Sequence, residues 1–419
     1  MTGYRQLARN RDFTILWSGE AASQLGSAVS LFCFPLVGYA LTGSAVLAGI
    51  PVAAFLLGHV AALLPAGVVV DRTDRQRLML VASGTGVLVY ASVAAAAAAG
   101  ALTLPHLVAA GFLTGVGAGV FGPAEMSAVR TVVAQDELPT ALSQNQARQH
   151  VGALVGGPLG GLLYGVGRAV PFVFDAVTFA ISFVAISRLR SDLSAPHRGR
   201  ANPLRRDLVE GLRYIAARPY FRTMVTYGAI SNLVVNAIFY VAILRLIQAE
   251  VAPAKIGLIE TCAGLGGILG ALAAPYVIDR LRTGTLTVLV AWSWVPLLLP
   301  VALWPTPWVI GAMLGLGLLL NPAGNAGAQS YRMAITPPEL QGRIASASAF
   351  CSMSVMPLAP ILGGWLLEQY GGVVATAGLM VAAVVAALVP TLARSVRSVP
   401  KPSEWNAQPD HAAPEPVAA

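Results

Sequence analysis

Long apolar runs follow one another along the 419-residue chain and are separated by short polar segments that carry arginine. A helix of about 20 apolar residues spans the hydrocarbon core of a bilayer. Strand-like alternation is absent from the runs, and a helix pairs its backbone polar groups within one segment, as lipid requires. The pattern predicts an all-α membrane protein with twelve transmembrane helices. The expected spans are 13–41, 44–70, 78–100, 105–129, 141–167, 169–189, 221–248, 255–278, 284–303, 307–331, 343–368 and 372–393.

A polar stretch divides these spans into six and six. We therefore expect an N-terminal segment (1–12), a first six-helix bundle (13–189), a linker (190–220) and a second bundle (221–394). The tail, 395–419, has several prolines and no apolar run, which predicts disorder.

Composition excludes several classes of function. The chain is 56% apolar and 11% charged, whereas soluble domains are about 25% charged, so a soluble enzyme or a disordered protein is excluded. Five scattered histidines and three cysteines in apolar runs give no metal-ligand spacing, so we expect no metal and no other cofactor. The only lysines follow Ala254 and Pro400, which excludes the Gly-Lys-Ser/Thr loop of an ATP-driven pump. We expect no enzymatic activity, because the linker is too short for a catalytic domain.

The basic residues predict the orientation. All but three of the 27 lysines and arginines fall on the side of the N-terminus, and the exceptions are Arg168, Arg245 and Lys255. Loops rich in Lys and Arg stay on the cytoplasmic side during insertion, so both termini are expected in the cytoplasm of a cell-membrane protein. The net charge of +8 is spread over every inner loop, which argues against a nucleic-acid partner.

The two halves repeat short sequence features in the same order. Gly160-Gly161 returns as Gly363-Gly364, and Asp71-Arg72 returns as Asp279-Arg280. The partners lie on the same predicted side of the membrane, which indicates a parallel duplication. Such halves pack around an axis along the membrane normal and hold the substrate between them.

Two motifs indicate a family. The loop GVVVDRTDRQR, Gly67 to Arg77, resembles the inner-loop signature G-x-L-a-D-R-x-G-R-x-x of the major facilitator superfamily. Asp74 replaces the second glycine, as in the branch that resembles enterobactin exporters and macrolide efflux pumps. GALVGGPLGGLL, Gly152 to Leu163, resembles the antiporter signature with its proline displaced by one, and APILGG, Ala359 to Gly364, is a closer match. The resemblance covers about residues 10–395, but the arginine that the family places in span four is missing before Glu125.

The resemblance implies a conformational latch and close helix packing. Asp71 would pair with the N-terminal end of span eleven in the outward-facing state, and Arg75 would pair with Asp136 or Glu137. The alternative is that these charges only enforce topology. The latch residues are Gly67, Asp71, Arg72, Arg75 and Asp136. The packing motif comprises Gly152, Gly156, Gly157, Pro158, Gly160, Gly161, Pro360, Gly363 and Gly364, and packing without a role in exchange stays open.

Polar side chains within the spans are the candidate site residues, because intramembrane charges usually face a cavity or a partner. Burial disfavours a carboxylate's charge and a nearby arginine favours it, so Glu20 and Glu125 are the proton-coupling candidates, with Arg148 or Arg130 as counter-charge. A structural ion pair is the alternative. For Asp175 and Glu260 the sequence leaves two roles open, a conformational latch and proton coupling. The resemblance implies that spans one, four, seven and ten line the substrate cavity. The candidate cavity residues are Gln24, Ser27, Asn232, Asn236, Tyr240, Asn321, Asn325 and Gln329.

These features together predict a secondary active transporter. We expect a proton-coupled antiporter that exports an amphipathic small molecule (a drug, a siderophore or a secondary metabolite) by alternating access, acting as a monomer in contact with membrane lipid. An uptake permease of the same fold is the first alternative. A non-transporting membrane sensor is the second.

Overall fold

The computed structural model describes residues 7, 9–135, 137–194, 204–337 and 340–407, and these residues form helices and no strand. The N-terminal half contains α2 (Arg11–Thr42), α3 (Ala45–Arg72), α4 (Arg75–Ala98), α5 (Leu104–Val132), α6 (Leu138–Val166) and α7 (Val170–Ser187). The linker contains α8 (Leu204–Ala217). The C-terminal half contains α9 (Pro219–Gln248), α10 (Pro253–Arg280), α11 (Thr283–Leu303), α12 (Pro307–Leu319), α13 (Asn321–Ala334), α14 (Gln341–Met353) and α15 (Leu358–Leu392). Helix α16 (Arg394–Arg397) and the 3₁₀ helix η2 (Pro402–Ala407) follow.

The helices confirm the predicted all-α membrane architecture. Among the described residues, 10 helical segments are long and apolar enough to span a membrane. One of them, Gln341–Leu392, holds the last two predicted spans, which are separated at Gly371 by a φ of 74°. The more polar α6 occupies predicted span five. The outer bounds of the spans lie within three residues of the predicted bounds.

Two spans predicted as continuous are broken in the structure. Span 307–331 is divided into α12 and α13 at Leu320, and span 343–368 is divided into α14 and α15 by a turn at 354–357. Pro322 and Pro357 lie at these breaks, and a proline removes one helical hydrogen bond and clashes with the preceding turn. The break before α13 lies beside the central cavity described below, where irregular backbone in a membrane protein is tolerated.

The expectation of a disordered tail is wrong for residues 395–407. The side chains of Val396 and Val399 are buried, and the backbone amide of Gly284 donates to the Val399 carbonyl at 3.2 Å. The Trp405 ring lies against the Tyr331 ring, with 5.5 Å between the ring centroids and an angle of 60° between the ring planes. These contacts attach the segment to α11 and α13, while the rest of the tail, 408–419, lies outside the described residues.

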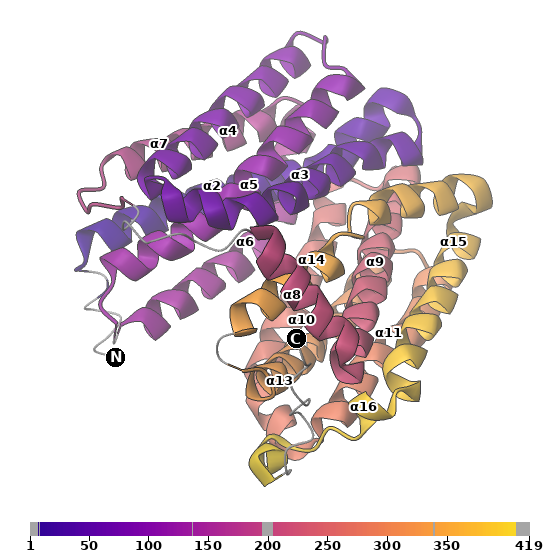
Figure 1. Ribbon diagram of the computed structural model, residues 1–419. Helices are drawn as coiled ribbons and strands as arrows, with labels where there is room; N and C mark the ends of the chain where they lie inside the picture. The colour runs from indigo at the N-terminus through magenta and orange to yellow at the C-terminus, as the bar shows by residue number, and fades with distance from the viewer. Residues whose placement is uncertain (1–6, 8, 136, 195–203, 338–339, 408–419) are drawn as a thin grey trace.

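The two halves contact each other mainly through two helix pairs, α6 with α10 and α3 with α15. Figure 1 shows the two bundles meeting where α3 approaches α15 and diverging away from that point. We call the end of the molecule that holds Ser44 and Pro253 the sealed end, and the opposite end, which holds Arg72 and Arg343, the open end.

Glycine makes the close contacts between halves possible. A Cβ at Gly161 would contact the Pro253 carbonyl and lie 2.7 Å from Ala254 Cα in α10, and a Cβ at Gly364 would lie 2.5 Å from the Ala45 carbonyl in α3. The neighbouring glycines of each pair pack within their own half, Gly160 against α2 and Gly363 against α9. The glycine pairs repeated in the sequence therefore correspond to two equivalent contacts between the halves, α6 with α10 and α15 with α3.

We predict that Gly161→Ala loosens the sealed end, because the added methyl group meets backbone atoms of α10 that a side-chain rotation cannot move. Overpacking of this kind costs about 1–3 kcal/mol. The variant should melt at a lower temperature in detergent than the native protein. Gly165→Ala is the matched control, because it lies one turn further along α6 and a Cβ there meets nothing within 4 Å. Equal melting temperatures for the two variants would contradict the tight contact.

Candidate functional site

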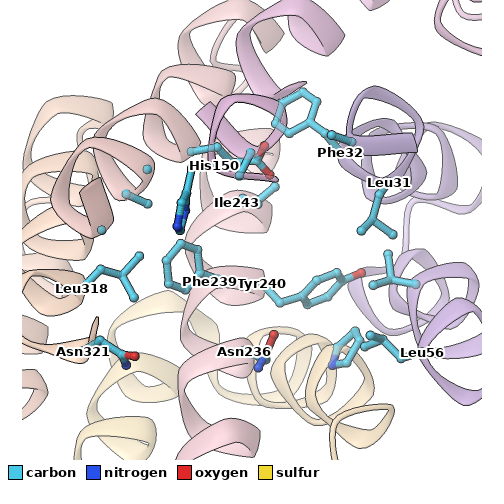
Figure 2. A pocket seen from close by; sticks show the side chains of 18 of the residues that line it. Leu31, Phe32, Leu56, His150, Asn236, Phe239, Tyr240, Ile243, Leu318 and Asn321 are labelled. Atoms are coloured by element: carbon cyan, nitrogen blue, oxygen red, sulfur yellow. The ribbon is translucent and has the colours of Figure 1, made fainter. Parts of the chain in front are cut away.

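A central cavity of about 680 Å³ lies between the two halves. In Figure 2, Phe239 and Tyr240 of α9 project into it, with Leu31 and Leu56 on one side and Leu318 on the other. The complete lining is Ala28, Leu31, Phe32, Pro35, Val52, Leu56, His150, Ala153, Asn236, Phe239, Tyr240, Ile243, Glu260, Ala263, Gly264, Gly267, Leu318, Asn321, Pro322, Asn325 and Pro360. A cavity of this size, largely apolar with a few polar groups, is typical of a site for a drug-sized molecule.

Four of the eight predicted cavity residues line this space. Asn236 and Tyr240 come from α9, and Asn321 and Asn325 come from α13. Asn325 Nδ2 donates to Asn321 Oδ1 at 2.6 Å, one turn apart. The buried hydroxyl of Tyr240 has no hydrogen-bond partner among the described residues. Asn236 Nδ2 donates to the Asn232 carbonyl at 2.8 Å, so Tyr240 is the one of these four side chains whose polar atom is buried without a partner in the described residues.

The other four predicted cavity residues lie elsewhere. Gln24 and Ser27 line a second cavity, of about 290 Å³, inside the N-terminal half. Gln329 lines a third cavity, also of about 290 Å³, between α9, α13 and α14. Asn232 lines none of these three cavities, and its amide donates to the Ser352 carbonyl at 3.3 Å. The residues predicted to line one cavity are therefore divided between three cavities and a hydrogen bond between α9 and α14.

The three proton-coupling candidates converge on the second cavity. Arg148 Nη2 lies 2.8 Å from Glu125 Oε1, and Arg148 Nε donates to Gln24 Oε1 at 2.9 Å. Asn145, one turn before Arg148 on α6, directs its amide toward Glu125 at 3.4 Å. Glu125 and Arg148 are 8% and 6% exposed, so this ion pair is shielded from solvent. Sequence reasoning missed Asn145, although it lies one turn from the predicted Arg148 on the same span.

Glu20 adds a second carboxylate to the same cluster. Its charge interacts with those of Glu125 and Arg148, yet its Oε2 is buried with no hydrogen-bond partner among the described residues. We call Glu20, Gln24, Glu125, Asn145 and Arg148 the N-half charge cluster. Two carboxylates here share one guanidinium, so the cluster carries a net negative charge unless a proton or another cation joins it.

Asp175 lies apart from that cluster. It is fully buried in α7 and accepts a hydrogen bond from Thr178 Oγ1 at 3.2 Å. A Cβ at Gly26 of α2 would contact its carboxylate. The contact places Asp175 in the packing between α2 and α7.

The predicted latch is only partly described. Arg72 is exposed, and Gly67 has no atom within 4 Å of an added Cβ. Arg75 is buried, its backbone amide donates to the Leu193 carbonyl at 3.3 Å, and its Nε has no partner among the described residues. The Asp71 side chain and all of Asp136 lie outside the described residues. The pairings of Asp71 and of Arg75 with Asp136 therefore stay predictions, whereas Arg75 and Glu137, both of which the structure describes, form no ion pair.

The packing motif separates into two rows on α6. Gly152, Gly156 and Gly160 face α2, whereas Gly157 and Gly161 face α10 of the other half. Pro158 lies inside the continuous helix α6. Pro360 lines the central cavity, and its carbonyl lies 2.8 Å from a Cβ added at Gly49.

A contact at the sealed end was not predicted from the sequence. Glu368 of α15 accepts hydrogen bonds from Ser44 Oγ at 2.8 Å and from the Val46 amide at 3.1 Å. Ser44 caps α3, so the carboxylate of one half binds the positive N-terminal end of a helix of the other half. The available signal was an acidic residue one turn after Gly364, at the predicted end of a span.

Two six-helix bundles that close at one end around a shared cavity define a membrane transporter. A family model described as Major Facilitator Superfamily matches residues 16–356 and 228–419, and the chain belongs to this family. The chain is 27% identical over 358 residues to the multidrug efflux pump Tap of Mycolicibacterium fortuitum, which covers 83% of this chain and 87% of that protein. It is 27% identical over 395 residues to the multidrug efflux pump Tap of Mycobacterium tuberculosis strain H37Rv, which covers 88% and 89% of the two chains.

Solved structures share the fold at low sequence identity. A bacterial homologue of the human lysosomal transporter Spinster, inward-facing and unoccupied, matches with a TM-score of 0.73 and 14% identity over 94% of this chain and 98% of that chain. A bacterial homologue of the iron transporter ferroportin, inward-facing, matches with a TM-score of 0.68 and 15% identity over 91% and 98%. These matches agree with the fold described above.

We predict that Glu368→Gln shifts the protein toward conformations that are separated at the sealed end. The substitution removes the charge from two hydrogen bonds across the halves. A charged acceptor strengthens such bonds, and solvent screening reduces this gain at an exposed site. Distances measured between spin labels on α3 and α15 at this end should show a larger population of molecules in which the two helices are separated. Glu250→Gln is the control, since Glu250 is exposed in the turn between α9 and α10. Identical distance distributions in both variants would remove Glu368 from the seal.

We predict that Arg148→Gln destabilises the protein more than Glu125→Gln/Arg148→Gln does. The single change leaves two buried carboxylates without a cation, and breaking a buried pair from one side costs about 3–5 kcal/mol. Thermal unfolding in detergent should show the double variant closer to the native protein. If the double variant is the less stable of the two, the ion pair is not what compensates these charges.

Proposed function

We propose that this transporter is a proton-coupled antiporter that exports amphipathic small molecules. The observation that carries the proposal is the N-half charge cluster, in which two buried carboxylates share one guanidinium, beside a large apolar cavity between the halves. The cluster supplies a site for a proton, and the cavity supplies a site for cargo. The proton gradient is the energy source, and no cofactor is required.

Binding of one proton would neutralise the cluster. Arg148 is held by Glu125 and Gln24, which leaves Glu20 as the less satisfied carboxylate and the first acceptor of the proton. The same helix that carries Arg148 packs on α10 through Gly157 and Gly161. A change in the charge balance at Arg148 therefore acts on the helix that forms the contact between halves.

Export is favoured over uptake by the relatives, which are named multidrug efflux pumps. The orientation follows from charge, because arginines of the connecting segments gather at the open end, among them Arg72, Arg188, Arg282 and Arg343. This end therefore faces the cytoplasm of the cell membrane, and both termini lie there. In this conformation the cavity would load cargo from the inside. Both carboxylates and the guanidinium belong to one chain, so a monomer suffices.

Transport direction is tested with everted membrane vesicles. An acid-inside gradient should drive uptake of the fluorescent drug analogue ethidium into vesicles that contain the protein, and a protonophore should abolish it. Faster accumulation of ethidium by intact cells that express the protein would instead indicate an uptake permease. Absence of any movement in either preparation would favour a non-transporting role.

We predict that Glu20→Gln and Glu125→Gln each abolish gradient-driven transport but retain counterflow exchange. Glutamine imitates the protonated acid and cannot release a proton, whereas exchange of one cargo molecule for another needs no net proton movement. Both rates are measured in proteoliposomes with ethidium. Glu250→Gln serves as control. Normal gradient-driven transport in both variants would remove these carboxylates from coupling.

A further inference from the structure

The central cavity contains one acidic side chain, Glu260, among its lining residues. Glu260 lies in α10 where that helix crosses α6, and its Cβ lies 3.0 Å from a Cβ added at Gly157. The absence of a side chain at Gly157 leaves space for the carboxylate beside the crossing. The next residue, Thr261, fixes the crossing by donating its hydroxyl to the Leu154 carbonyl at 3.0 Å.

Glu260 has no counter-charge among the described residues. The structure shows no ion pair or hydrogen bond to its carboxylate, in contrast to Glu125, Glu210 and Glu368, which are all paired or hydrogen-bonded. Lys255, at the start of the same helix, forms no ion pair within the described part of the chain. Arg148 on the neighbouring helix α6 is occupied by Glu125 and Gln24.

Few other titratable groups face this position. His150 of α6 and Tyr240 of α9 line the same cavity, and Cys33 of α2 lies within electrostatic range of Glu260. None of the three makes a hydrogen bond to Glu260 in the described residues. The cavity is therefore an apolar space with one uncompensated acid in its wall.

We infer that Glu260 is the counter-charge for a cationic group of the cargo, so that the central cavity selects amphipathic cations over neutral molecules of the same shape. An isolated carboxylate in apolar surroundings is costly unless a cation or a proton joins it. Phe32, Phe239 and Tyr240 line the same space, and aromatic faces attract cations and bury apolar bodies. This inference rests on the proposed function and adds the chemical class of the cargo.

The inference assigns two roles, binding of the cargo's charge and proton transfer, to acidic residues in different halves. The N-half charge cluster already holds a cation of its own in Arg148, and its cavity of about 290 Å³ is less than half the volume of the central one. Glu260 has no cation of its own and faces the larger space. Cargo charge is therefore matched at Glu260, and the proton is carried at Glu20 and Glu125.

The test compares two probes of similar shape, the permanent cation tetraphenylphosphonium and the neutral triphenylphosphine oxide, by equilibrium binding to the purified protein in nanodiscs. We expect Glu260→Gln to weaken tetraphenylphosphonium binding by about tenfold or more, equivalent to about 1.4 kcal/mol, and to leave triphenylphosphine oxide binding within about twofold. Glu260→Asp, which keeps the charge, should retain part of the preference for the cation.

Two controls keep the result interpretable. Glu250→Gln makes the same change of charge outside the cavity and should leave both affinities unchanged. Retained binding of the neutral probe shows that Glu260→Gln is folded. The inference is overturned if the native protein does not prefer the cation, or if Glu260→Gln keeps that preference.

Transport separates this inference from the proposed function. Glu260→Gln should still use the proton gradient to move a neutral probe, because the N-half charge cluster is intact. Loss of gradient-driven movement of every probe by the native protein would refute the proposed function. Gradient-driven transport with unchanged charge preference in Glu260→Gln would refute only the assignment of Glu260.

Discussion

The rest of the structure depends on the close approach of helix backbones across the two halves at the sealed end. Gly157 and Gly161 bring α6 against α10, and Gly364 brings α15 against α3. Within a membrane the hydrophobic effect does not hold helices together, so small residues that permit tight van der Waals contact take its place. A contact between backbones also has few interdigitating side chains to lock it. Such a contact is suited to halves that seal the cavity at one end and can separate there.

Helix α6 connects this contact to the charged groups. One row of its glycines packs on α2 and the other on α10, while Arg148 holds Glu125 of α5 and Gln24 of α2. Arg148 and Gly157 are nine residues apart, which is about 13 Å along a helix. Arg148 and Asn145 of the charge cluster and the glycines of the contact between halves therefore lie on one continuous helix. This arrangement gives protonation a physical route to the conformation without a long chain of intermediates.

The sequence was informative where a single residue type determines the outcome. Apolar runs predict spans because lipid requires a helix to pair its backbone polar groups within one segment. The polar residues of spans one, four and five predicted that Glu20 and Glu125 lie near an arginine, but the sequence left Arg148 and Arg130 open as that arginine. Prolines were ambiguous, because Pro35, Pro123 and Pro158 lie inside continuous helices, whereas Pro322 and Pro357 accompany breaks. The contact of Glu368 with Ser44 could not be predicted, since these residues are 324 positions apart and only the relative placement of the halves brings them together.

In the proposed antiport, the distribution of charge separates recognition of the cargo from proton coupling. The wall of the central cavity is mainly apolar, so it offers a cargo molecule few directional contacts. Coupling demands the opposite, since a proton site needs fixed partners, and the N-half charge cluster has them in Arg148, Gln24 and Asn145. Placing the two in separate cavities allows the cargo site to vary in occupant without disturbing the geometry of the proton site. In the proposed mechanism, the glycine contacts of α6 with α10 would transmit the state of the proton site to the contact between the halves.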